Sequence, residues 1–523
     1  MTRNLFIRIF ITLSLISIAS CKHKPKEQCK PIEEITIPEL QTCYNEGTRT
    51  VSEVVAYYIE QIKTMDWDGP ELHSVIMINP DAVDIAAKLD EELKNGHSRG
   101  PLHGIPVLLK DNIDTHDMME TTGGSRALLG SYPLKDSWVA AKLREAGAVI
   151  LGKTNLSEWA NFRSFSSSSG WSGVGGQTKN PYVLTQNPCG SSSGSGVAVS
   201  ANFCMLAIGT ETNGSIVCPS GANGIVGIKP TVGLISRSGI IPISFTQDTP
   251  GPMARTVTDA AICLGALTGT DTTDSKTLNS KDLSLSDYTP FLNPKGLKGK
   301  RIAVYTGPTG ILPEVDSLFK LAINDMKAAG AELVTDFKTV YDTLALDYSF
   351  DVLLYEFKDG INSYLASLGD EAPVKTLADI IAFNKGDSLE LKYFDQKILE
   401  MAEDKGDLNS PEYLEALNKM KEMSTTEGID KLMDEYDLDA IIAPTGSPAW
   451  RTDLENGDSF VLSSSSPAAM AGYPNITLPM GFVNNLPVGI SIFGRAWSEP
   501  VLIEIAFGYE QKTKHRKVPK FLN

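Results

Sequence analysis

Two serine–glycine segments on either side of a short apolar stretch restrict the possible folds of this chain more than any other part of its sequence. The first, Cys-Gly-Ser-Ser-Ser-Gly-Ser-Gly, spans 189–196, and the second, Gly-Thr-Glu-Thr-Asn-Gly-Ser-Ile-Val-Cys-Pro-Ser, spans 209–220. Residues 197–208 between them are apolar or small, which indicates a buried helix or strand that fixes both segments relative to each other. A flexible surface loop is the alternative interpretation, but it fits poorly beside so apolar a stretch.

The second segment contains what an oxyanion hole requires. Glycine adopts backbone conformations that other residues avoid, so the N–H groups of such a segment can converge on one point. Convergent N–H groups beside a serine hydroxyl stabilise the oxyanion of an acyl-transfer reaction. Ser215 is therefore the candidate nucleophile, and the candidate backbone donors are Thr212, Asn213, Gly214 and Ser215.

A serine nucleophile needs a neighbouring base, and histidine is scarce here. The chain has six histidines, and no Gly-x-Ser-x-Gly elbow with a downstream Asp and His can be assembled. A lysine is the alternative base. Lys110 ends the apolar run Val107–Leu109, in a strand that we expect to be buried, and desolvation lowers the pKa of a lysine toward neutrality. Lys153 has a similar context and is the rival candidate.

The remaining sequence alternates between helix and strand patterns, which is typical of an α/β fold. Apolar periodicity predicts helices over 52–65, 81–94 and 138–146, with strands at 74–78, 104–112 and 148–151 between and after them. Further strands are predicted at 300–305, 332–335, 439–444 and 488–493, with helices near 315–329 and 499–512. Residues 350–436 predict a mostly helical lobe. No linker divides the chain, so we expect one large domain.

These segments resemble the amidase signature family, which includes fatty acid amide hydrolase, bacterial peptide amidase and the A subunit of glutamyl-tRNA amidotransferase. The order of Gly227–Gly233, Asp248–Pro252 and Arg255 matches the family, as do Ala469–Pro479 and Pro487–Ile490. The resemblance extends from about Ile37 to Lys514. It implies a central twisted mixed β-sheet covered by helices on both faces, within a catalytic domain at 37–515 followed by a tail at 516–523.

The resemblance also implies a Ser–Ser–Lys triad. The family's lysine falls on Lys110, its bridging serine, preceded by a cis peptide bond, on Ser191, and its acyl-forming serine on Ser215. Neutral Lys110 would take a proton through Ser191 while Ser215 attacks an amide carbonyl, and water would then hydrolyse the acyl-enzyme. Ser192 is a possible support for the lysine. The resemblance implies no metal ion or organic cofactor.

One departure from the family bears on the substrate. The family often reads Gly-Gly-Ser-Ile-Arg at the nucleophile, whereas this chain reads Asn213-Gly-Ser-Ile-Val217. In the amidotransferase the arginine is tied to an acidic amino-acid substrate, so Val217 favours the peptide-amidase branch, with small amides or C-terminally amidated peptides as substrates. The alternatives are an amidotransferase component of the A type, which acts with a partner, and a catalytically silent envelope-binding protein.

The N-terminus predicts export. Arg3 and Arg8 accompany an apolar run to Ile18, and Ile-Ala-Ser-Cys at 18–21 resembles a bacterial lipobox. We expect residues 1–20 to be a lipoprotein signal peptide, Cys21 to carry the lipid, and residues 21–36 to form a polar tether, so that the protein is lipid-anchored in the bacterial cell envelope. A plain signal peptide with a coincidental cysteine is the alternative.

The net charge and the cysteine spacing restrict which partners and ligands we expect the protein to bind. A net charge of −17 with few basic clusters argues against nucleic-acid binding. Export permits disulfides, and Cys29–Cys43 is a conceivable pair, whereas Cys204 and Cys263 lie in apolar runs and are expected to be buried thiols. The cysteine spacing shows no metal-ligand pattern.

Overall fold

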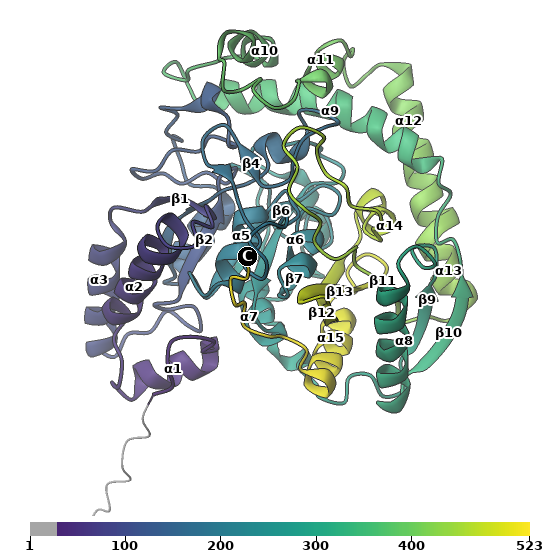
Figure 1. The fold of residues 1–523 in the computed structure, drawn as a ribbon, viewed down its shortest axis with the longest axis horizontal. Coiled ribbons are helices and arrows are strands. Elements are labelled where there is room, and N and C mark those ends of the chain that lie inside the picture. The colour runs from purple at the N-terminus through teal and green to yellow at the C-terminus, as the bar shows by residue number, and fades with distance from the viewer. Residues whose placement is uncertain (1–28) are drawn as a thin grey trace, which may run out of the picture.

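The computed structural model describes residues 29–523, except for the side chains of residues 335 and 336 (Figure 1). The predicted signal peptide, the lipidation site Cys21 and the first half of the predicted tether lie outside the described residues.

A mixed sheet of 11 strands forms the centre of the fold, in the order β1-β3-β2-β6-β8-β7-β12-β13-β11-β9-β10. Strands β3, β2 and β6 run parallel to one another, as do β11, β9 and β10, while the strands between these two groups pair antiparallel. The strands are β1 (Val75–Ile78), β2 (Pro106–Lys110), β3 (Val149–Thr154), β6 (Leu206–Glu211), β7 (Val226–Lys229), β8 (Thr249–Ala254), β9 (Arg301–Tyr305), β10 (Glu332–Phe337), β11 (Ala440–Pro444), β12 (Asn475–Val483) and β13 (Leu486–Phe493).

Helices flank this sheet, which confirms the predicted fold class (Figure 1). Strands β4 (Trp171–Ser172) and β5 (Gly176–Gln177) form a separate small hairpin. The α-helices are α1 (Ile37–Asn45), α2 (Val51–Gln61), α3 (Ala82–Lys94), α4 (Trp138–Glu145), α5 (Ser193–Ser200), α6 (Val217–Ala222), α7 (Val257–Leu267), α8 (Pro313–Ala328), α9 (Ala345–Ser367), α10 (Leu377–Gly386), α11 (Lys397–Glu403), α12 (Pro411–Ser424), α13 (Asp430–Glu435), α14 (Ser466–Ala471) and α15 (Glu499–Thr513).

The strands that carry the predicted site are buried on both faces. Val107, Leu108 and Leu109 of β2 are fully buried, as expected for a strand in the parallel part of a covered sheet. The apolar stretch 197–208 forms the end of α5 and the start of β6, so it is helix first and strand afterwards. The first serine–glycine segment therefore lies at the beginning of α5, and the second runs from the end of β6 through the following turn into α6.

The predicted helical lobe is present as α9 to α13, drawn in green along the upper and right-hand edge of Figure 1. A fully buried arginine fastens it to the body of the domain. Arg163 Nη1 donates to Glu158 Oε1 (2.6 Å) in the body and to Glu390 Oε2 (3.1 Å) in the segment that follows α10.

Both ends of the described chain pack against the domain. Residues 29–36 fall in the predicted tether, yet Ile35 is buried and a disulfide joins Cys29 to Cys43. In the predicted C-terminal tail, Arg516 Nη2 donates to Glu34 Oε1 (2.7 Å). Apolar side chains at 32 and 35 exclude water there, so this part is not a free tether. None of the helices within residues 29–523 is both long and apolar enough to span a membrane.

Candidate active site

Lys110 and Ser191 meet in the interior of the domain. Strand β2 ends at Lys110, which is completely buried, and its Nζ lies 2.8 Å from Ser191 Oγ at hydrogen-bonding distance. The Gly190–Ser191 peptide bond is cis, as predicted. The end of a buried strand thus presents an amine to the loop that precedes α5.

Thr210, in β6, holds the other side of the amine. Lys110 Nζ donates to Thr210 Oγ1 (2.9 Å) and is 3.3 Å from the Thr210 carbonyl oxygen. Burial lowers the pKa of Lys110 to about 7, although the carboxylates of Asp248 and Glu211 act in the opposite direction. Near neutral pH the amine is therefore available as a proton acceptor, since desolvation disfavours its charged form.

Ser215 lies in the turn between β6 and α6, beside the same loop. Its carbonyl oxygen accepts a hydrogen bond from the Ser192 N–H (3.1 Å). Within the described chain, the backbone N–H groups of all four predicted oxyanion donors, 212–215, donate to no protein acceptor. Gly214 has a φ of +86°, a left-handed conformation that glycine adopts without strain. The turn thus leaves unused N–H groups around the predicted nucleophile.

Two carboxylates hold the two ends of this turn. Glu211 Oε2 accepts from the N–H groups of Ile216 (2.8 Å) and Val217 (3.0 Å). Asp248 Oδ1 accepts from the Thr212 hydroxyl (2.6 Å), and burial raises the pKa of Asp248 to about 6. Because both ends of the turn are held, its free N–H groups keep a fixed direction, which is what electrostatic stabilisation of an oxyanion needs.

Ser215 opens into a cavity of 330 Å³ with largely apolar walls. It is 9% exposed, and no hydrogen bond joins its hydroxyl to Ser191 in the described structure. No histidine is among the described residues that line this cavity, and in residues 29–523 no group of three or more His, Cys, Asp or Glu side chains is placed to hold a metal ion. The wall includes Phe162, Ile243, Leu353, Trp450, Asp458 and Phe460.

The structure separates the two candidate lysines. Lys153 is also buried, but its Nζ donates to the Ile113 carbonyl (2.7 Å) and to Thr121 Oγ1 (2.8 Å), away from both serines. Ser192 does not bond Lys110 directly. Its hydroxyl donates to the Thr210 carbonyl (3.1 Å), the same oxygen that Lys110 Nζ approaches.

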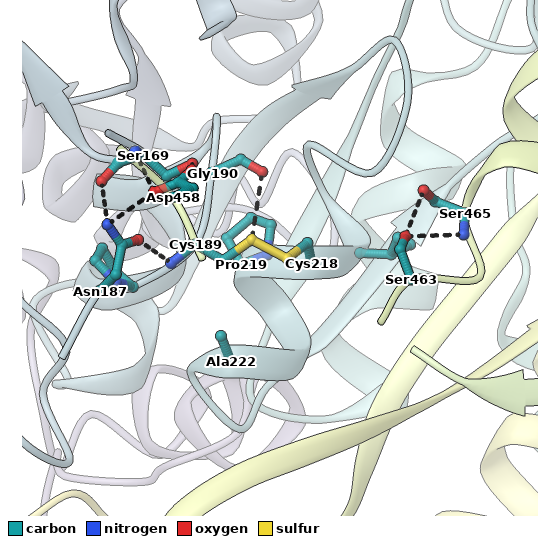
Figure 2. The surroundings of a disulfide bond; sticks show 12 residues. Ser169, Asn187, Cys189, Gly190, Cys218, Pro219, Ala222, Asp458, Ser463 and Ser465 are labelled. Carbon is teal, nitrogen blue, oxygen red and sulfur yellow. Dashed lines mark hydrogen bonds between the residues drawn. A yellow bond between two sulfur atoms is a disulfide. The ribbon is translucent and has the colours of Figure 1, made fainter. Parts of the chain in front are cut away.

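Sequence reasoning missed two features of this site. Thr210 lies inside the second serine–glycine segment, and nothing in its spacing distinguishes it from the neighbouring polar residues. A disulfide joins Cys189 to Cys218, one cysteine from each serine–glycine segment (Figure 2). The presence of a cysteine in both segments was the signal that could have revealed this pairing. Cys204 and Cys263 are buried free thiols, as predicted.

The α/β domain thus sets a buried amine against one serine loop and opens the other serine loop into a cavity, an arrangement suited to acyl transfer. The amidase family model matches residues 53–503, so the chain belongs to the amidase family. The chain is similar to the peptide amidase from Stenotrophomonas maltophilia, with 47% identity, a TM-score of 0.90 and coverage of 94% of this chain and 99% of that one. A probable amidase of Arabidopsis thaliana is 43% identical, over 97% of this chain and 96% of the relative. The A subunit of the glutamyl-tRNA(Gln) amidotransferase of Thermosynechococcus vestitus is 34% identical, over 92% of this chain and 99% of the relative.

Proposed function

We propose that this amidase hydrolyses carboxylic amides with Ser215 as nucleophile, Ser191 as proton bridge and Lys110 as base. The observation that carries the proposal is the 2.8 Å contact between the buried Lys110 amine and the Ser191 hydroxyl, next to the turn that holds Ser215. A hydroxyl is a weak nucleophile without an activating base. A desolvated, neutral lysine is a suitable base.

The hydrogen-bond pattern gives the relay its direction. A neutral amine has two N–H bonds and one lone pair, and both oxygens of Thr210 lie within reach of Nζ as acceptors. When both N–H bonds of the amine donate to the oxygens of Thr210, its lone pair points toward the Ser191 hydroxyl. Ser191 then passes its proton to Lys110 and takes the proton of Ser215 as that hydroxyl attacks the carbonyl carbon.

The second half of the reaction uses the same groups in reverse. The oxyanion that forms on the carbonyl oxygen is held by N–H groups from the 212–215 turn, which have no other acceptor within the described chain. The proton stored on Lys110 returns through Ser191 to the leaving nitrogen, which departs as an amine or ammonia because a protonated nitrogen leaves more readily. Water attacks the acyl-enzyme by the same route and releases a carboxylic acid.

The substrates that we infer are small amides or C-terminally amidated peptides. The apolar and aromatic side chains around the 330 Å³ cavity suit an uncharged acyl group. The similarity to the Stenotrophomonas peptide amidase supports the same class. Val217 stands where the amidotransferase pattern has an arginine, so the alternative role as part of an amidotransferase has less support.

Labelling and substitution test the proposal. A fluorophosphonate should modify the peptide that contains Ser215, and Lys110→Ala should abolish both labelling and amide turnover while the fold is retained. Lys153→Ala is the matched control, because that lysine is equally buried but contacts neither serine. Labelling confined to other peptides, or near-normal turnover by Lys110→Ala, would contradict the assigned roles. A panel of aliphatic, aromatic and peptide amides then identifies the substrate class.

A further inference from the structure

The disulfide between Cys189 and Cys218 joins the two loops on which the relay depends. Cys189 directly precedes the Gly190–Ser191 bond, and Cys218 lies one helical turn after Ser215, in α6. Figure 2 shows the bond between the loop at Gly190 and the helix that carries Cys218. The sequence separation of the two cysteines is 29, and the closed stretch of chain contains both serines.

Each loop is held separately by its own surroundings. On the Cys189 side, the Cys189 N–H donates to Asn187 Oδ1 (2.8 Å), and Asn187 Nδ2 donates in turn to the Ser169 carbonyl (2.9 Å) and to Asp458 Oδ1 (3.3 Å). On the Cys218 side, the Glu211 carboxylate holds the start of α6. These anchors belong to different parts of the chain, so they do not by themselves fix the distance between the two loops.

Besides the two bonds between the Ser192 hydroxyl and the Thr210 backbone, few hydrogen bonds cross from one loop to the other at this edge. The Ser192 N–H donates to the Ser215 carbonyl (3.1 Å), and Asn223 Nδ2 donates to the Pro188 carbonyl (2.9 Å). The relay itself adds no such link, since the hydroxyls of Ser191 and Ser215 are not hydrogen-bonded to each other in the described structure. Their separation is therefore set by the loops, and the disulfide is the covalent connection between them.

We propose that the Cys189–Cys218 disulfide is a positioning cross-link that holds Ser191 and Ser215 at the separation proton transfer requires, and that its reduction reversibly lowers turnover. This inference rests on the proposed Ser–Ser–Lys function. A displacement of about 1 Å between reacting groups can cost about a hundredfold in rate. The pair acts through the serines and does not touch the substrate's reacting atoms.

Both cysteines line the cavity that opens onto Ser215, so a small reductant that enters this cavity can reach the bond. Reduction by a dithiol transfers two electrons and two protons to the pair. The sulfur–sulfur bond breaks, each cysteine becomes a thiol, and the dithiol closes to its own disulfide. The second disulfide, Cys29–Cys43, lies on the N-terminal segment and is a matched control.

The test compares oxidised and dithiothreitol-reduced full-length protein, with alkylation and mass spectrometry to show which pair has been opened. We expect opening of Cys189–Cys218 to lower kcat about tenfold or more with KM within about twofold, and reoxidation to restore kcat. Cys189→Ser/Cys218→Ser should have the low kcat and no response to reductant. Cys29→Ser/Cys43→Ser should keep the wild-type kcat and the wild-type response.

Hydrogen exchange in 188–192 and 213–218 provides a readout that does not depend on activity, and should rise when the bond opens. The inference is overturned by unchanged kcat and exchange after mapped reduction, by free thiols at both positions in the isolated protein, or by a loss of kcat that coincides with global unfolding. If the oxidised protein hydrolyses no amide, the proposed function fails, and exchange alone decides whether the cross-link holds the loops.

Discussion

Lys110 is fully buried, and within the described chain its amine faces no carboxylate at hydrogen-bonding distance. Burial lowers its pKa to about 7. The active form is the neutral amine, so activity should be low below pH 6, rise through about pH 7 and level off above it. The measurement is kcat/KM against pH for a neutral amide. A rate that is flat from pH 5 to pH 9 would contradict the role of Lys110 as base.

Thr210 allows a sharper test of the same amine. Thr210→Val keeps the shape of the side chain but removes the Oγ1 acceptor, so one amine hydrogen loses its partner and the lone pair is no longer directed at Ser191. We expect kcat to fall between about tenfold and a hundredfold with little change in KM, which is less than the hundredfold to ten-thousandfold that general acid–base catalysis typically contributes, because Lys110 itself is retained. Thr210→Ser retains the hydroxyl and should restore most of the rate. Equal activity of the valine and serine variants would show that Thr210 has no positioning role.

At the scale of single residues, the sequence predicted those features of the site that depend on neighbouring residues in the chain. An apolar run before Lys110 indicated a buried amine, and glycines around Ser215 indicated free N–H groups. The role of Thr210 depends on the pairing of β2 with β6, and the Cys189–Cys218 bond depends on how α5 and α6 pack. Both are consequences of tertiary structure, which residue spacing does not contain.

The elements themselves were predictable where their hydrophobic pattern is strong. Strands β2, β3, β9 and β11 and helices α3, α4 and α15 lie close to the predicted positions. Strand β8 was missed because its sequence, Thr-Pro-Gly-Pro-Met-Ala, carries two prolines and a glycine, which argue against a strand on local propensity alone. It nevertheless pairs with β6 and β7 across the sheet, so long-range pairing overrides local propensity there.

Arg163 is one of the contacts that attach the helical lobe α9–α13 to the body of the domain. Its guanidinium pairs with Glu158 and Glu390, and both carboxylates are buried. Arg163→Leu removes the cation and leaves two buried acids without it, which typically costs about 3–5 kcal/mol. We expect a lower midpoint in urea unfolding and faster hydrogen exchange in the segment that follows α10.

Arg495→Leu is the matched control for that substitution, because Arg495 pairs with Asp434 at the surface, where both side chains are well exposed. Exposed pairs contribute about 0–1 kcal/mol. If Arg163→Leu proved as mild as the surface variant, the buried cluster would not be what fastens the lobe.

For the whole molecule, the two ends of the described chain lie together, which bears on the proposed lipid anchor. The Glu34 carboxylate accepts from Arg516 Nε (2.8 Å) and Nη2 (2.7 Å), and Asn202 Nδ2 also donates to it (2.7 Å). Within the described residues, the chain therefore packs against the domain from about Cys29 onward. Cys21 and Cys29 are eight positions apart in the sequence, and eight residues span at most about 28 Å. A lipid on Cys21 would hold the catalytic domain close to the membrane surface.

Replacing Cys21 tests this arrangement. We propose that Cys21 carries the lipid, so Cys21→Ser should move the protein from the membrane fraction to the soluble fraction without changing kcat, because Cys21 is not one of the residues of the proposed relay. Cys29→Ser/Cys43→Ser retains Cys21 and should stay with the membrane, which separates loss of the anchor from loss of a cysteine. A lipid on Cys21 would keep the protein on the membrane in high salt. Adsorption of the chain through its charges, which sum to −17, would instead be electrostatic and sensitive to salt. Wild-type protein that is already soluble, or that high salt releases, would rule out the anchor and leave the catalytic proposal unaffected.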